Sequence, residues 1–194
     1  MTTNLKIINT TINSTYSNLS SGSYTIPASG KWSQSGSGVM ATEVYTNGAV
    51  SANSTVYYSW NTATAGTGYA SGTYKTPTGS ICPKNWILPT KAQFVTAAGK
   101  YTSSSDSYAN QLSKVTGSNG PKYTKSGWYN PYGQAYNGVN SYVDYWTSNT
   151  ETNSTNWFHA WYFGVTSDDG VTWNNRTSRI EKNKGMSVRC MFNG

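Results

Sequence analysis

The side chains able to do acid–base or nucleophilic chemistry are few and widely spaced in this sequence. His159 is the only histidine, and the seven acidic residues include one adjacent pair, Asp168-Asp169. A Ser-His-Asp triad built on His159 would need a presented serine, but the chain has no GxSxG motif. Hydrolysis by two carboxylates needs a positioned pair, whereas Gly170 directly after Asp168-Asp169 is typical of a turn. We therefore expect His159 to be a contact or packing residue, and we predict that the protein is not an enzyme.

Cysteine chemistry is restricted by the spacing of the two cysteines. Cys82 and Cys190 lie 108 positions apart (190 minus 82). This separation excludes a CxxC redox motif and a cysteine-rich zinc site. We predict neither a metal nor any other cofactor.

Basic residues outnumber acidic ones, 14 to seven, which gives a net charge of +7. The densest run consists of Arg176, Arg179, Lys182, Lys184 and Arg189, and such a run could follow a phosphate backbone. We interpret it instead as a solvated strand edge protected by cations. No nucleic-acid partner is predicted.

The composition is polar but carries little charge. Charged residues make up 11% of the 194 positions and the mean hydropathy is −0.59, because Ser (27), Thr (27) and Asn (20) supply the polarity. This excludes a helical bundle, and no apolar run reaches the roughly 18 residues of a membrane span. Aromatic residues at 14% argue against disorder. Met1–Ile12 lacks the sustained apolar core of a secretory signal.

Two helices are indicated in the middle of the chain. The first follows Pro89, with Thr90 as its cap and Gly99 as its end. The second is expected over Ser107–Val115, with Asp106 as the cap and Gly117 as the end. Gly117–Tyr142 is rich in Gly, Asn, Tyr and Pro, and a connection of that length is usually functional or self-packed. Its tyrosines are candidate contact residues: Tyr129, Tyr132, Tyr136 and Tyr142.

Strands are predicted on both sides of the helices. Residues 1–30 are interpreted as an arm or short strands, and residues 31–194 as the domain proper. Val39–Tyr45 and Val50–Trp60 flank Asn47-Gly48, which is a hairpin signal. Asn156–Val165 places large apolar residues on both faces and should be covered on both sides for part of its length. Further strands are expected at Val171–Thr177, after the Asp169-Gly170 turn, and at Met186–Phe192, with Val188, Cys190 and Phe192 on one face.

Three ordered motifs carry a family resemblance. Cys82-Pro83-Lys84-Asn85-Trp86-Ile87-Leu88-Pro89-Thr90 resembles the CPxGWxLPT signature of the Fibrobacter succinogenes major paralogous domain, with Asn85 and Ile87 departing from it. Tyr145-Trp146-Thr147-Ser148 resembles its YWSST motif, and Gly185-Met186-Ser187-Val188-Arg189-Cys190 its GxSVRC motif. The resemblance covers about residues 57–192. That family is similar in fold to the formylglycine-generating-enzyme branch of the C-type lectin fold.

The resemblance implies an α+β, C-type-lectin-like fold with two helices, a small twisted and mostly antiparallel sheet, and much irregular chain. Cys82 and Cys190 match two family cysteines that lie close in space. They would form a disulfide in an exported chain and would be small buried hydrophobes in a reducing cytosol. Oxidase activity of the formylglycine-generating type needs a pair of reactive cysteines at the active site. Here each cysteine belongs to one of the structural motifs, so we do not expect that activity.

The same branch includes the variable proteins of diversity-generating retroelements, in which asparagine codons become NNY codons. NNY excludes Trp, Lys, Glu, Gln and Met. Several segments hold only NNY residues, and Trp146, Trp157, Trp161 and Trp173 fall between them as fixed anchors. The segments are Thr147–Thr150, Thr152–Asn156, Phe158–Ala160, Thr166–Thr172 and Asn174–Ile180. The resemblance thus implies a diversified C-terminal segment at about residues 145–194.

Calcium-dependent sugar binding is not expected. The sugar-binding C-type lectins use an EPN or QPD loop with WND, and this chain has neither loop. Trp173-Asn174-Asn175 comes near to WND but lacks the carboxylate that calcium favours.

The predicted function is therefore binding through a surface rich in Tyr, Trp, Ser, Asn and Gly, as in antibody paratopes. We expect a protein or glycan ligand on another cell or virus, and an extracellular or cell-surface location. An invariant adhesin and a degenerate enzyme remain alternatives. The candidate ligand-binding residues are Asn149, Thr150, Thr152, Asn153, Ser154, Asn156, Phe158, His159, Trp161, Asp168, Asp169, Thr172, Asn174, Asn175, Arg176 and Thr177.

Overall fold

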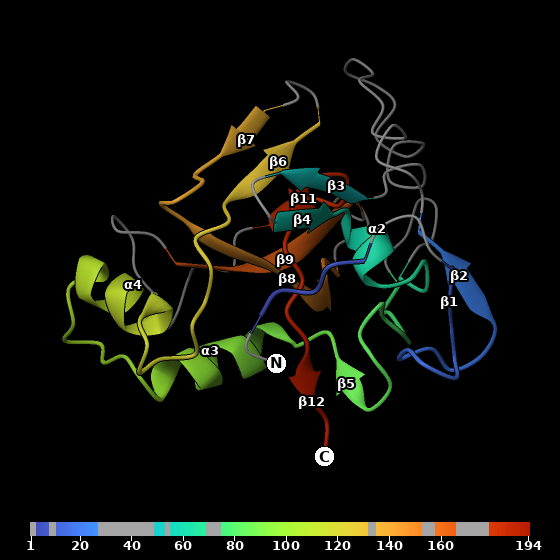
Figure 1. The fold of residues 1–194 in the computed structure, drawn as a ribbon, viewed down its shortest axis with the longest axis horizontal. Coiled ribbons are helices and arrows are strands. Elements are labelled where there is room, and N and C mark those ends of the chain that lie inside the picture. The colour runs from blue at the N-terminus through green and yellow to red at the C-terminus, as the bar shows by residue number, and fades with distance from the viewer. Residues whose placement is uncertain are drawn as a thin grey trace.

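A computed structural model describes residues 3–7, 11–26, 49–52, 55–68, 75–131, 135–152, 158–165 and 179–194. Within these ranges, short strands form four small sheets, and three helices pack beside them (Figure 1). Among the described strands every pair is antiparallel, and an isolated parallel bridge joins Tyr145 to Ser187. The prediction of a mixed α+β fold with mostly antiparallel pairing and much irregular chain is confirmed.

Helix α3, Lys91–Gly99, begins where the sequence predicts. The Thr90 side chain accepts a hydrogen bond from the backbone N–H of Gln93, and the Gln93 side chain accepts one from the backbone N–H of Thr90 at 2.7 Å. This reciprocal capping box satisfies two N–H groups that the first turn leaves without intrahelical partners. Phe94 and Ala98 form the buried side of the helix.

Replacing Thr90 with alanine is expected to lower the free energy of unfolding by about 1 kcal/mol, because the cap of α3 is lost. Thr96→Ala is the matched control, since Thr96 is an exposed threonine of the same helix and caps nothing. Urea denaturation of the two variants gives the comparison. Equal stabilities of the two variants would show that the capping box contributes nothing.

Helix α4, Tyr108–Thr116, begins one residue later than predicted. Ser107 is its cap and accepts a hydrogen bond from the backbone N–H of Asn110, so the assignment of Asp106 as the cap is wrong. The Asp106 carboxylate instead accepts from the backbone N–H of Ser103 at 2.7 Å and pairs with Lys114 at 2.6 Å. The hydrogen bond from Lys114 is the main cause of the lowered pKa of Asp106.

A five-stranded sheet has the order β3-β4-β11-β6-β7. Its strands are β3 (Ala49–Ala52), β4 (Thr55–Tyr58), β11 (Gly185–Met186), β6 (Trp128–Asn130) and β7 (Ala135–Asn137). The prediction of one strand over Val50–Trp60 is wrong. That segment supplies the paired strands β3 and β4, after which Ser59 caps the short helix α2, Trp60–Ala63. The predicted Val39–Tyr45 strand and Asn47-Gly48 turn lie outside the described residues.

The long segment Gly117–Tyr142 packs on itself in part, through the β6–β7 hairpin. Tyr129 pairs with Tyr136 in register, and their ring centroids lie 5.0 Å apart. Tyr136 also packs on Tyr57 at 5.4 Å and remains partly exposed. After β7, Gly138 has a φ of +66°, and a Cβ there would overlap the ring of Tyr142, so the chain needs glycine at this close approach. Tyr132 lies outside the described residues.

The three-stranded sheet β10-β9-β8 is covered on both faces along part of its length, as predicted for its central strand. Its strands are β8 (Val143–Thr150), β9 (His159–Val165) and β10 (Arg179–Glu181). Val143, Tyr145, Phe163 and Val165 pack with α3 and α4 in one cluster, around Phe94. Trp146, Ala160 and Tyr162 belong to the second cluster, which includes α2 and strands of the five-stranded sheet. In Figure 1 the two helices α3 and α4 lie on one side of β8 and β9, and the five-stranded sheet lies on the other.

The last strand of the chain is shorter than predicted. Within the expected strand Met186–Phe192, residue 186 ends β11, and only Met191–Phe192 forms β12, which pairs with β5 (Trp86–Ile87). Val188 and Cys190 are buried, but Phe192 is 61% exposed, so the three do not share a buried face. The alternation fails because residues 187–190 form no regular strand.

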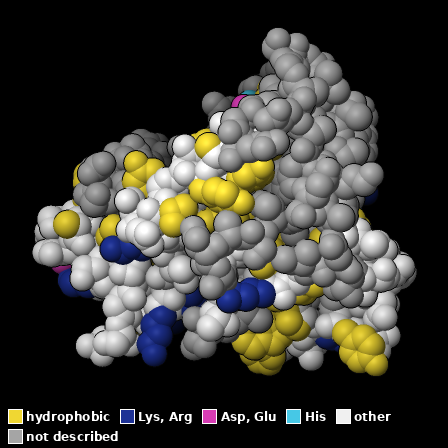
Figure 2. All heavy atoms as spheres, turned by 45° about the horizontal axis from the view of Figure 1, so that its top comes forward, with side chains coloured by type: hydrophobic (Ala, Val, Ile, Leu, Met, Phe, Trp, Pro, Cys, Tyr) yellow, Lys and Arg dark blue, Asp and Glu magenta, His cyan; other side chains and the backbone are white. Residues whose placement is uncertain are grey.

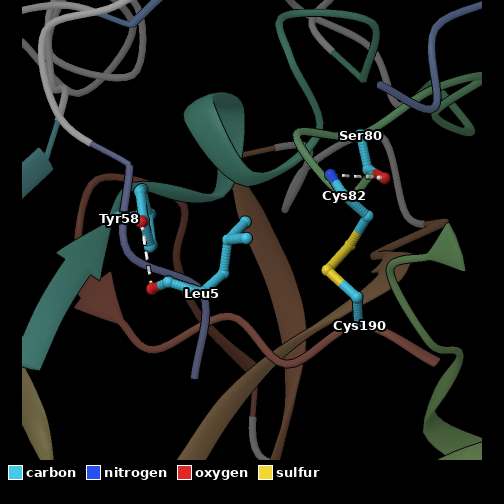
Figure 3. The surroundings of a disulfide bond; sticks show 5 residues. All are labelled: Leu5, Tyr58, Ser80, Cys82 and Cys190. Carbon is cyan, nitrogen blue, oxygen red and sulfur yellow. Dashed lines mark hydrogen bonds between the residues drawn. A yellow bond between two sulfur atoms is a disulfide. The ribbon is translucent and has the colours of Figure 1, made fainter. Parts of the chain in front are cut away.

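A disulfide joins Cys82 to Cys190 across a Cα–Cα distance of 5.7 Å (Figure 3). Both cysteines belong to the larger core cluster. The backbone N–H of Cys82 donates to the Ser80 hydroxyl at 3.3 Å, and nearby the Tyr58 hydroxyl donates to the Leu5 carbonyl at 3.1 Å (Figure 3). The bond therefore ties the segment before β5 to the segment before β12.

The described part of residues 1–30 packs onto the rest of the chain. It contains the paired strands β1 (Thr11–Asn13) and β2 (Ser23–Thr25), in agreement with the short strands expected there. Leu5 and Ile26 are buried in the larger core cluster. Among the described residues, no helix has both the length and the apolar character needed to cross a membrane.

The interpretation of the C-terminal basic run as a solvated edge is wrong for three of its members. Lys182, Lys184 and Arg189 are only 2%, 6% and 5% exposed. Each is placed over an aromatic ring, of Trp60, Trp128 and Tyr123 respectively, so their charges face π-systems. On the face drawn in Figure 2, surface Lys and Arg side chains lie in separate patches among hydrophobic ones.

Candidate functional site

Six of the candidate ligand-binding residues lie in the described part of the chain. Asn149 and Thr152 are exposed, Phe158, His159 and Trp161 are half-buried, and Thr150 is buried. The other ten lie outside the described residues, as do the predicted Asp169-Gly170 turn and Val171–Thr177 strand. These ten are Asn153, Ser154, Asn156, Asp168, Asp169, Thr172, Asn174, Asn175, Arg176 and Thr177.

The six described candidates gather where β8 ends and β9 begins. Thr150 pairs in register with Ala160, after a register shift that begins at Trp146. The His159 carbonyl accepts from the Thr150 hydroxyl at 3.4 Å and from the backbone N–H of Glu151 at 3.3 Å. The antiparallel pairing of β8 and β9 therefore brings residues 149–152 beside residues 158–161.

The start of α3 determines which part of β9 is exposed. His159, Trp161, Phe163 and Val165 share one face of the strand, because side chains alternate along it. Phe163 and Val165 are buried in the cluster formed with α3 and α4, whereas Trp161 and His159 are half-buried. Trp161 lies beside Lys91, the first residue of α3. The Nζ atom of Lys91 is 4.7 Å from the ring centroid of Trp161. The face of β9 thus becomes accessible toward its N-terminal end.

Lys91 is a member of the site that the sequence did not predict. Its backbone N–H donates to the Oδ1 atom of Asn149 at 2.8 Å, and the neighbouring N–H of Ser148 donates to the Pro89 carbonyl at 2.9 Å. Burial lowers the pKa of the Lys91 ammonium. The sequence placed Lys91 at the first position of the helix, directly after the cap Thr90, but only the fold brings that end of the helix beside β8 and β9.

Lys182 supports the other side of the site and was also missed. Its backbone N–H donates to the Phe158 carbonyl at 2.8 Å, and the Phe158 and His159 ring centroids lie 4.2 Å apart. Its Nζ atom lies 4.6 Å from the ring centroid of Trp60, and burial lowers its pKa to about 8. Its sequence context, next to charged neighbours, gave no sign of burial.

Buried tryptophans hold the strands beneath the site. Trp146 is fully buried, and its indole N–H donates to the Tyr58 carbonyl at 2.6 Å. The indole N–H of Trp60 donates in turn to the Thr147 carbonyl at 2.8 Å. Thr147, Thr150 and Ala160 are also buried, although all three belong to the NNY set. Burial therefore divides the NNY residues into scaffold positions and surface positions.

The chemistry that this arrangement offers is contact. It combines the indole of Trp161 and the nearby Lys91 ammonium with the neighbouring rings of Phe158 and His159. The exposed side chains of Asn149 and Thr152 add an amide and a hydroxyl group. Aromatic rings provide contact area at low entropic cost, and small polar side chains provide adaptable hydrogen bonds. Across the described residues, no three His, Cys, Asp or Glu side chains gather in a way that could hold a metal ion.

Nothing matches this chain among the family models, the curated proteins or the solved structures.

Proposed function

We propose that the protein is a ligand-binding receptor that displays a variable C-terminal surface on a C-type-lectin-like scaffold, diversified by a retroelement. One observation carries this proposal. Of the two tryptophans of β8 and β9, which NNY codons cannot encode, Trp146 is fully buried and Trp161 is half-buried, whereas the NNY residues Asn149 and Thr152 are exposed and Phe158 and His159 are half-buried at one end of the sheet. A fixed core beneath a substitutable surface is what such a mechanism requires.

The expected ligand is a protein or glycan on another cell or virus, bound at the cell surface or outside the cell. The Cys82–Cys190 disulfide supports this location, because disulfides persist mainly in oxidising compartments. The mixture of aromatic and small polar side chains supports a macromolecular ligand, since such surfaces adapt to varied epitopes.

The gene and its surroundings provide the first test. Diversification predicts a nearby partial copy of the 3′ end, with adenines at the codons for Asn149, Thr152, Phe158 and His159, together with a reverse-transcriptase gene. Among isolates, these codons should vary while the codon for Trp146 stays constant. A complete genomic neighbourhood with neither the copy nor the reverse transcriptase would refute diversification. Invariant codons in a protein that still binds cells would favour the adhesin.

Binding itself is tested by applying the labelled protein to a glycan microarray and to cells from the same environment. We expect Thr152→Arg and Phe158→Ala to abolish the signal, because both change the exposed end of the β8–β9 pair. Thr96→Ala, on the exposed side of α3, is the control and should bind like the unmodified protein. A signal that survives both site variants would place the binding surface elsewhere.

A further inference from the structure

A cavity of about 510 Å³ opens between the end of α3, residues 120–123 and the β5–β12 pair. None of the candidate ligand-binding residues lines it. Its volume falls within the range of small-molecule sites, which is roughly 300–1,000 Å³. The cavity is therefore separate from the candidate site at the β8–β9 end.

Three cations and no acidic residue line this cavity. Lys100 and Lys122 are exposed at its border, while Arg189 is 5% exposed. The guanidinium of Arg189 donates to the carbonyls of Lys122, at 2.9 Å, and of Pro121. Within the described residues, no carboxylate forms an ion pair with any of the three cations. The two carbonyls and the Tyr123 ring offset the charge of Arg189 only in part, since none of them is an anion, so a bound anion would supply the missing counter-ion.

Aromatic side chains form the walls around these cations. Trp86 and Phe192 are paired across β5 and β12, with ring centroids 5.6 Å apart in an edge-to-face arrangement. The guanidinium of Arg189 lies 4.8 Å from the ring centroid of Tyr123. Phe192 and Tyr101 leave 61% and 42% of their surfaces exposed. A ligand with a flat apolar ring would cover these surfaces, and such burial is favourable.

From this combination we infer that the cavity binds a small organic anion in which a flat aromatic ring carries a carboxylate or phosphate group. The acidic group of the ligand pairs with Lys100, Lys122 and Arg189, and its ring packs against Trp86 and Phe192. The size of the cavity favours a small molecule over a protein segment. Anion binding here adds a second recognition site to the molecule, and it does not depend on the proposed diversification.

The test is an NMR titration of the intact, oxidised protein with 2-naphthoate and with its neutral analogue 2-naphthamide, following the indole N–H signal of Trp86. We expect 2-naphthoate to bind with a Kd near or below about 1 mM, which corresponds to about −0.3 kcal/mol for each non-hydrogen atom. The amide should bind about tenfold more weakly, since a hydrogen bond to a charged group contributes about 1.4 kcal/mol more than a neutral one. Added salt should weaken the binding of 2-naphthoate but not that of 2-naphthamide.

Variants at the border of the cavity keep the test specific. The double change Lys100→Gln and Lys122→Gln should weaken 2-naphthoate about tenfold and leave 2-naphthamide unchanged. Phe192→Ala should weaken both ligands. Lys6→Gln removes an exposed cation elsewhere and should change neither. All four positions are exposed, so the variants should fold. Equal affinity for the acid and the amide, an unchanged affinity in the double variant, or no shift with either ligand would each overturn the inference.

Discussion

Reduction of the Cys82–Cys190 disulfide is expected to lower the free energy of unfolding by about 4–5 kcal/mol. The bond closes a loop with a sequence separation of 108, and in the chain-entropy model a cross-link of that span removes about this much free energy from the unfolded state. Both sulfurs lie in the larger core cluster, so the bond also holds the β5–β12 pair against it. Denaturation in urea with and without dithiothreitol measures the loss.

The double variant Cys82→Ala and Cys190→Ala separates the cross-link from the side effects of the reductant. Its stability should match that of the reduced protein and should not respond to dithiothreitol. If reduction leaves the denaturation midpoint of the unmodified protein unchanged, the cross-link does not restrict the unfolded chain as argued.

Asp144→Asn is expected to remove most of the loss of stability between pH 4 and pH 8. Asp144 is buried on β8, its Oδ2 atom has no hydrogen-bond partner within the described structure, and burial raises its pKa from 3.8 to about 7. The folded state therefore holds a proton that the unfolded state releases near pH 4. This contribution is complete below the unfolded pKa and is lost as the pH rises through about 7, a change of roughly 4 kcal/mol. Asparagine stays neutral throughout.

Asp106→Asn provides a control of opposite sign. The pKa of Asp106 is lowered, chiefly by its hydrogen bond with Lys114, so its stabilisation is present above the unfolded pKa and is lost on acidification. Urea denaturation over the pH range shows both effects. If the unmodified protein and Asp144→Asn have the same pH profile, Asp144 is ionised in the folded protein.

The sequence predicted elements best where the signal was local. Thr90 with Gln93 three residues later places the start of α3, because a capping box lies within one turn. At α4 two good caps stand side by side, and the contacts that Asp106 makes with Ser103 and Lys114 leave Ser107 as the cap. Propensity alone does not choose between such neighbours.

Which side chains are buried and which are exposed depends on long-range packing, and the sequence did not predict it. Strand alternation places Trp161 on the same face as Phe163, yet only the position of α3 explains why Phe163 is buried and Trp161 half-buried. The NNY alphabet likewise groups Thr147 with Asn149, whereas the structure buries the first and exposes the second. Burial of Lys182 over Trp60 depends on residues more than a hundred positions apart in the chain.

The most direct test of the account compares two displayed libraries built with NNY codons, one at Asn149, Thr152 and Phe158, the other at the buried positions Thr147, Thr150 and Ala160. The measurement is the fraction of clones that resist protease, followed by selection of the resistant clones on immobilised lysozyme as a model protein ligand. We expect the surface library to stay largely resistant and to yield binders, and the buried library to lose its resistance. Equal loss of resistance in both libraries, or a resistant surface library without binders, would contradict a substitutable binding surface on a fixed scaffold.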